Sequence, residues 1–197
     1  MSQNHPALLG RAFFLEWCTL AWNVVGVFIL IVAAWRARSV ALAGFGLDSL
    51  VEIGASTVVL WELAGSGEER TRRALRLIGV AFSLIALYLL IQGIVALASH
   101  HQAQHSPVGI LWTALTAGAM FTLARTKSMV GRALKNPAVL AEARVTFIDG
   151  VLASSVLLGL ALNALFNWWW ADPAAGFVIT YYALREVREV RRALVAP

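Results

Sequence analysis

Charged side chains are scarce in this sequence of 197 residues. Asp, Glu, Lys and Arg make up 14% of it, against about a quarter in ordinary soluble domains. Apolar residues make up 59%, and the mean hydropathy is +0.72. A soluble core of this size could not bury so much apolar surface. The composition therefore excludes a soluble globular enzyme, a nucleic-acid-binding domain and a disordered chain, and it predicts an all-α integral membrane protein.

Cysteine and targeting signals are also nearly absent. Cys18 is the only cysteine and lies in an apolar stretch, which excludes a disulfide framework and a CxxC metal site. Residues 1–11 lack a basic start followed by a short apolar stretch and a small-residue cleavage site. We therefore expect no removable signal peptide.

Long apolar stretches fill most of the chain. At about 20 apolar residues per membrane span, the length accommodates about six helices and short loops. We place the spans at residues 12–35, 40–61, 74–99, 109–124, 138–166 and 170–184. The sequence thus predicts a six-transmembrane-helix bundle that forms a single domain over residues 1–197, with no separate soluble domain.

Basic residues are distributed unevenly between the predicted loops. Those expected on one side are Arg11, Arg70, Arg72, Arg73, Arg76, Arg125, Lys127, Arg132, Lys135, Arg185, Arg188, Arg191 and Arg192. The opposite side has only Arg36 and Arg38. Because cytoplasmic loops carry the excess of Lys and Arg, we expect both termini to be cytoplasmic. We interpret these residues as topology determinants and not as a nucleic-acid patch.

Acidic residues occur inside or at the start of predicted spans, where ionisable groups are costly and commonly functional. They are Glu16, Asp48, Glu52, Glu142 and Asp149. Asp48 and Glu52 are four residues apart and so share one helix face. We expect no basic residue within the spans to pair with these two or with Asp149. The remaining two have Arg11 and Arg144 as candidate partners.

Depth divides these side chains into two layers. At about 1.5 Å per residue, Glu52 and Asp149 fall near the bilayer midplane, as does Asn23. Glu16 and Glu142 fall near the cytoplasmic end, where they would form an entrance or an accessory site.

Clustered carboxylates in a medium of low dielectric constant cannot all stay ionised without a counter-cation. A divalent metal supplies that charge, and its binding releases protons. If the cluster is exposed alternately to the two sides of the membrane, the result is metal/proton antiport.

Three segments, in the right order, resemble the transmembrane domain of the cation diffusion facilitator family. The segments are residues 23–56, 141–163 and 170–186, which resemble its first two helices, its fifth and its sixth. The family's aspartate and the acidic residue four positions later match Asp48 and Glu52, and its fifth-helix aspartate matches Asp149. The resemblance implies a zinc-type efflux transporter, not an enzyme, with these three residues as metal ligands.

One ligand of that family's usual four is missing here. Many members place a histidine or aspartate four residues before the fifth-helix aspartate, where this sequence has Val145. Glu142, Glu16 and Asn23 are candidate accessory groups. The remaining ligands are oxygens, which favour harder ions than a histidine-containing site does. Zinc is the leading substrate cation, with manganese, iron, cobalt and cadmium as alternatives.

Typical members continue beyond the sixth helix into a cytoplasmic domain. Here about a dozen residues follow the sixth span, so we expect a short form whose homodimer would use the membrane helices. Short loops and the lack of a targeting segment favour a prokaryotic plasma (inner) membrane.

Other interpretations remain open. His100, His101 and His105 in an outer loop could be exit-side metal contacts or solvated loop residues. A non-transporting regulatory or scaffold protein of the same fold is one alternative function. A membrane phosphatidyltransferase is another, although the upstream Asp-Gly that its motif requires is absent.

Overall fold

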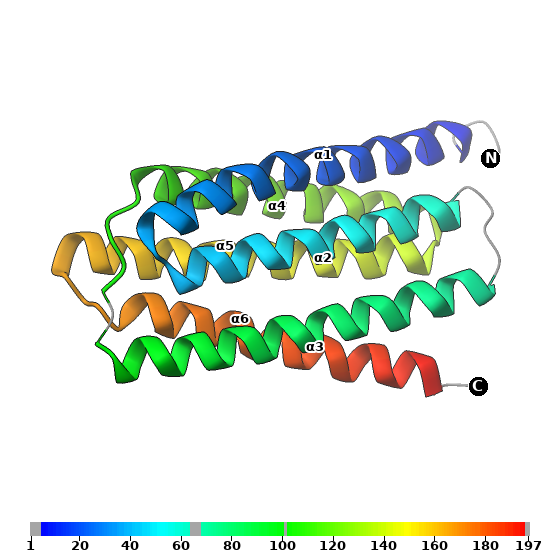
Figure 1. Ribbon diagram of the computed structural model, residues 1–197. Helices are drawn as coiled ribbons and strands as arrows, with labels where there is room; N and C mark the ends of the chain where they lie inside the picture. The colour runs from blue at the N-terminus through cyan, green and yellow to red at the C-terminus, as the bar shows by residue number, and fades with distance from the viewer. Residues whose placement is uncertain (1–4, 64–67, 101, 196–197) are drawn as a thin grey trace.

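Six helices make up almost all of the described chain. The structure is a computed structural model that describes residues 5–63, 68–100 and 102–195. The helices are α1 (His5–Ala37), α2 (Val40–Leu63), α3 (Glu68–Ala98), α4 (Pro107–Leu134), α5 (Pro137–Phe166) and α6 (Ala171–Val195). They run alternately in opposite directions in an elongated bundle with both termini at the same end (Figure 1). The all-helical fold prediction is confirmed.

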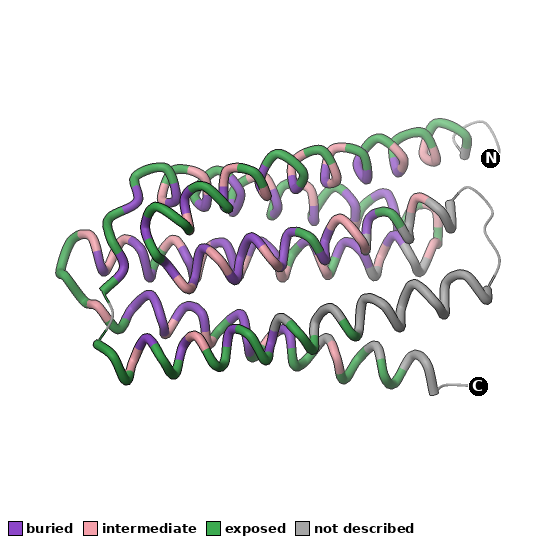
Figure 2. Tube along the Cα trace, in the orientation of Figure 1, coloured by how far each residue is buried: buried purple, intermediate pink, exposed green. Residues whose placement is uncertain are grey.

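Three stretches in the described residues are long and apolar enough to cross a membrane. They are Pro6–Ala37, Pro107–Leu134 and Glu142–Phe166. Buried residues face the middle of the bundle and exposed ones its outside (Figure 2). Large apolar side chains are among the exposed residues, such as Phe28 at 69% and Ile31 at 60% exposure. An apolar exterior around buried polar groups is the distribution expected of a protein whose solvent is lipid.

The helices extend beyond the predicted spans at the end where the termini lie. The prediction that the fourth span ends at residue 124 is wrong for the helix, because α4 continues to Leu134. Arg125 and Lys127, expected in a loop, therefore lie within α4. Arg11 likewise lies inside α1 and not before it. Lys and Arg are good helix formers, so the point where hydropathy falls is not the point where the helix ends.

Both ends of α4 have local sequence causes. The Ser106 side chain accepts a hydrogen bond from the Gly109 amide at 3.1 Å, and Pro107 occupies the first turn, where a missing amide hydrogen costs nothing. At the other end Lys135 has φ 53°, a left-handed residue whose amide bonds back to the Arg132 carbonyl. Such a residue ends a helix while satisfying its last carbonyls.

A carboxylate clamps α2 to α6 at the end of the bundle opposite the termini. Asp172, in the first turn of α6, accepts hydrogen bonds from the Ser39 hydroxyl and, at 2.9 Å, from the Val40 amide. The Ser39 hydroxyl in turn accepts from the Leu42 amide at 3.0 Å. The negative charge lies at the N-terminus of α2, where the helix dipole favours it. The start of α2 is thus fixed against the start of α6.

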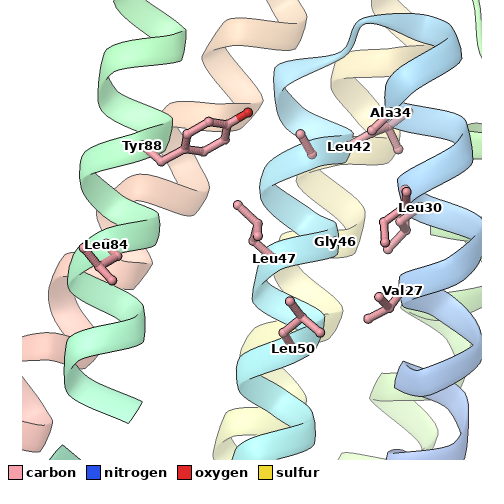
Figure 3. A pocket seen from close by; sticks show the side chains of 11 residues that line it. Val27, Leu30, Ala34, Leu42, Gly46, Leu47, Leu50, Leu84 and Tyr88 are labelled. Carbon is pink, nitrogen blue, oxygen red and sulfur yellow. The ribbon is translucent and has the colours of Figure 1, made fainter. Parts of the chain in front are cut away.

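The helices α3 and α6 lie together along one side of the bundle (Figure 1). A groove of about 520 Å³ lies between α3 and the α1–α2 pair. Figure 3 shows that its lining is mostly aliphatic, with Leu30 from α1, Leu47 from α2 and Leu84 from α3. Tyr88 supplies the one side-chain oxygen in this lining. None of the described residues that line the groove is charged.

Gly159 permits close contact between α5 and α6. A Cβ atom there would lie 2.9 Å from the Ala171 carbonyl oxygen and 2.9 Å from the Ala175 Cβ. Both neighbours are rigid. We expect Gly159→Ala to destabilise the protein by about 1–3 kcal/mol through overpacking. The measurement is thermal unfolding of the purified protein in detergent.

Gly118 in α4 is the matched control, because no described atom lies within 4 Å of a Cβ placed there. Gly118→Ala should leave stability unchanged or raise it by up to about 1 kcal/mol, since alanine is the better helix former. Equal melting temperatures for the two variants would contradict the close α5–α6 contact.

Candidate metal-transport site

Three of the predicted carboxylates line one small cavity between α2, α5 and α6. Asp48 and Glu52 extend into its lining from α2, and Asp149 from α5. Val145, the position of the missing ligand, and Tyr182 of α6 also line it. The cavity has about 20 Å³, and about 10–15 Å³ is enough for one water molecule. It is therefore of the size needed for one small ion.

All three carboxylates are buried, with 9% exposure for Asp48, 4% for Glu52 and 2% for Asp149. Neither carboxylate oxygen of Asp149 has a hydrogen-bond partner among the described residues. A buried polar group without a partner is costly and rare. Asp149 is thus the side chain of the cavity with unused capacity to bind a cation.

The described residues do not yet form a closed ligand set. No group of three or more His, Cys, Asp or Glu side chains among them lies close enough to hold a metal ion. Glu52 is held by another contact, because the Thr146 hydroxyl donates to its Oε1 atom at 3.2 Å. The three predicted carboxylates therefore line the cavity. One Glu52 oxygen, however, accepts a hydrogen bond from Thr146, on the side of the cavity where Glu16 and Glu142 lie.

Lys127 is a buried cation that the sequence interpretation assigned to a loop. Its side chain is fully buried in the bundle. The Nζ atom donates to Glu16 Oε2 at 2.9 Å and to Glu142 Oε1 at 3.1 Å. These glutamates thus pair with Lys127 and not with Arg11 or Arg144, the candidate partners named from the sequence. A lysine on the inward face of α4 lies between α1 and α5 and reaches both.

The inner acidic layer and the cavity are joined by hydrogen bonds. Lys127 Nζ also donates to Thr146 Oγ1 at 3.1 Å, and Thr146 passes its own hydrogen bond to Glu52. One turn further along α2, the Ser56 hydroxyl donates to Glu142 at 3.0 Å. The prediction of two layers is thus refined: an ammonium and a hydroxyl connect them. We call these six residues the Lys127 network: Glu16, Glu52, Ser56, Lys127, Glu142 and Thr146.

Sequence reasoning missed three members of this network, Lys127, Ser56 and Thr146. A usable signal for the lysine existed. Two glutamates lay near one membrane face, and the Lys and Arg residues after the fourth span are good helix formers, which could have placed a cation beside them. For the hydroxyl residues there was no signal, because Ser and Thr in helices commonly bond their own backbone.

The other candidate residues that the structure describes do not line the cavity. Asn23 is buried, but its amide donates to the Thr19 carbonyl at 3.1 Å and it does not line the cavity. His100 and His105 are exposed, and the His100 ring lies 4.9 Å from that of Trp169. His101 is outside the described residues.

Removing the ammonium group of Lys127 should lower the stability of the folded protein. Lys127→Met leaves two buried glutamates without their cation, and breaking a buried ion pair from one side costs about 3–5 kcal/mol. We expect a large drop in the thermal stability of the purified protein. Lys127→Met combined with Glu16→Gln and Glu142→Gln should recover part of the loss.

The exposed Arg192–Glu189 pair, 3.3 Å apart with 76% and 52% side-chain exposure, provides the control. Arg192→Met should change stability by no more than about 0.5 kcal/mol. A wild-type melting temperature for Lys127→Met alone would mean that the buried ion pair does not form.

Comparison with known proteins shows which family this chain resembles. Residues 76–195 match the family described as the cation efflux transmembrane domain. The chain is 29% identical over 210 aligned positions to the cation-efflux pump FieF of Klebsiella pneumoniae, an alignment that covers 99% of this chain and 69% of the relative. It is 28% identical to the Escherichia coli protein of that name, with the same coverage. It is 22% identical to transmembrane protein 163 of Xenopus laevis, with 86% of this chain and 62% of the relative covered.

Proposed function

Since this chain belongs to the cation efflux transmembrane domain family and is an integral membrane protein, we propose that it exports divalent metal cations in exchange for protons. Zinc is the first candidate substrate. The transported ion binds at the cavity lined by Asp48, Glu52 and Asp149. Relatives named as cation-efflux pumps support the direction of transport.

The observation that carries this proposal is the state of Asp149. Its carboxylate is buried, both its oxygens are without a donor among the described residues, and it shares a cavity with two further carboxylates. Protein packing disfavours such an arrangement unless a cation or a proton neutralises it. Exchange of one for the other is the reaction of an antiporter.

The contact between Thr146 and Glu52 suggests how the site is completed. Glu52 bonds to Thr146 in the observed conformation, and release of that bond lets the carboxylate turn toward Asp149. The resulting ligand set consists of carboxylate oxygens, because Val145 contributes none. Oxygen ligands extend the candidate substrates from zinc to manganese, iron, cobalt and cadmium.

The proposed orientation has six spans and both termini in the cytoplasm. Two observations support it: both termini lie at one end of the bundle (Figure 1), and most basic residues belong to that end. The bacterial relatives support an inner-membrane location.

Transport by the purified protein tests the proposal. We expect proteoliposomes to accumulate zinc, with an opposite movement of protons reported by a pH-sensitive dye in the same vesicles. Asp149→Asn and Asp48→Asn should each lower the flux at least ten-fold, since even weaker perturbations of metal sites cost 10–100-fold.

The control for these variants is Glu189→Gln, which removes a carboxylate that is 52% exposed and remote from the cavity. It should leave the flux unchanged. Wild-type flux in the two aspartate variants, or no movement of any divalent metal by the unaltered protein, would refute the transport proposal. The latter result would favour a regulatory or scaffold role.

A substitution at Val145, which lines the cavity, tests which metal the site prefers. Val145→His adds an imidazole to the cavity wall, and nitrogen ligands favour zinc over harder cations. We expect the zinc-to-manganese flux ratio to rise about ten-fold, the order found for changes at metal sites. Val145→Leu, which fills the same space without a ligand atom, should not raise it. An unchanged ratio in the histidine variant would show that this position does not face the transported ion.

A further inference from the structure

A second and larger cleft lies beside the carboxylate cavity. It has about 790 Å³ and is lined by residues of α4, α5 and α6. Ile148 and Tyr182 line both spaces and so form a shared wall. We call it the arginine cleft, after the residues at its rim.

Four arginines line this cleft. They are Arg125 and Arg132 from α4, Arg144 from α5 and Arg185 from α6. None of them takes part in an ion pair among the described residues, whose pairs involve Lys127 and Arg192. Arg132 bonds to the carbonyl and hydroxyl oxygens of Ser128, which are uncharged. All four side chains are exposed, and together they give this space a positive potential that favours an anion.

The rest of the lining is apolar and aromatic. Phe121 and Phe147 face each other across α4 and α5, with ring centroids 5.5 Å apart. Val151 continues this surface along α5, and Phe147 is 53% exposed. The cleft therefore combines a cationic part with an exposed apolar part.

Membrane topology alone does not account for this arrangement. An excess of basic residues on the cytoplasmic side explains why the arginines are at that end. The excess of basic residues does not explain why arginines from three helices line the same cleft. It also does not explain why that cleft includes an aromatic surface. A ligand with one anionic and one apolar part satisfies both features.

We propose that the arginine cleft binds an anionic phospholipid from the cytoplasmic leaflet. Guanidinium groups present paired donors that match phosphate oxygens, and basic pockets between transmembrane helices on the cytoplasmic side bind anionic headgroups. The acyl chain lies against Phe121, Phe147 and Val151. A free inorganic phosphate shares the headgroup chemistry but leaves the apolar surface uncovered.

Because the two spaces share a wall, a lipid bound in the arginine cleft should change the electrostatic potential in the carboxylate cavity. The arginines place positive charge beside a space proposed to hold a divalent cation, and like charges repel across it. The lipid phosphate offsets that charge. On the basis of the proposed transport function, zinc flux should therefore be faster in vesicles that contain phosphatidylglycerol than in phosphatidylcholine alone.

Binding is measured first and without reference to transport. The purified protein in detergent is titrated with phosphatidylglycerol or phosphatidylcholine, and bound lipid is resolved by native mass spectrometry. We expect a preference for phosphatidylglycerol. The double variant Arg125→Gln, Arg144→Gln should weaken that binding about 25-fold, from about five-fold per basic residue. If this variant does not fold, Arg132→Gln with Arg185→Gln carries the same expectation.

The matched control is Arg188→Gln with Arg191→Gln, two exposed arginines of α6 that do not line the cleft. It makes the same change in net charge and should retain binding. Equal phosphatidylglycerol affinity in the cleft and control variants would overturn the proposal. So would displacement of the lipid by inorganic phosphate at equal concentration, which would identify a soluble anion as the ligand. Absence of zinc flux in every lipid would overturn the transport proposal and leave the binding result standing.

Discussion

The ammonium group of Lys127 joins the polar interior of this bundle. It contacts Glu16 on α1 and both Glu142 and Thr146 on α5. In lipid, apolar side chains gain little by leaving one apolar medium for another, so small residues and polar contacts determine how membrane helices pack. A buried cation between two carboxylates is also costly to break, because each separated charge would remain buried. The relative positions of α1, α4 and α5 depend on this group.

The candidate cation site is the continuation of that network. Glu142, Thr146 and Asp149 follow one another at helical spacing along a single face of α5. The first two form side-chain hydrogen bonds, whereas Asp149 has no donor among the described residues. Within two turns of one helix face, α5 thus has side chains with hydrogen-bond partners and then a carboxylate without one. The contrast between these neighbours supports the proposed binding of an ion at Asp149.

Hydropathy was sufficient to predict the helices, and the cost of burying charge was sufficient to select Asp48, Glu52 and Asp149, which the structure places around one cavity. Their role as metal ligands stays a prediction. The role of Lys127 was missed from the sequence, because a lysine two residues after Arg125 has the pattern of a loop. Its partners are 111 and 15 residues away, and only the folded bundle brings them together.

Those two separations have a consequence for the order in which the chain assembles. Lys127 and Glu142 lie on consecutive helices and meet when the α4–α5 hairpin forms. Glu16 enters the membrane with the first helix and is 111 residues from its partner. Until α4 follows, its carboxylate has no ammonium to pair with, at a depth where an unpaired charge is disfavoured. The contact between Glu16 and Lys127 can therefore form only after α4 has entered the membrane, whereas the contact between Lys127 and Glu142 needs only the α4–α5 hairpin.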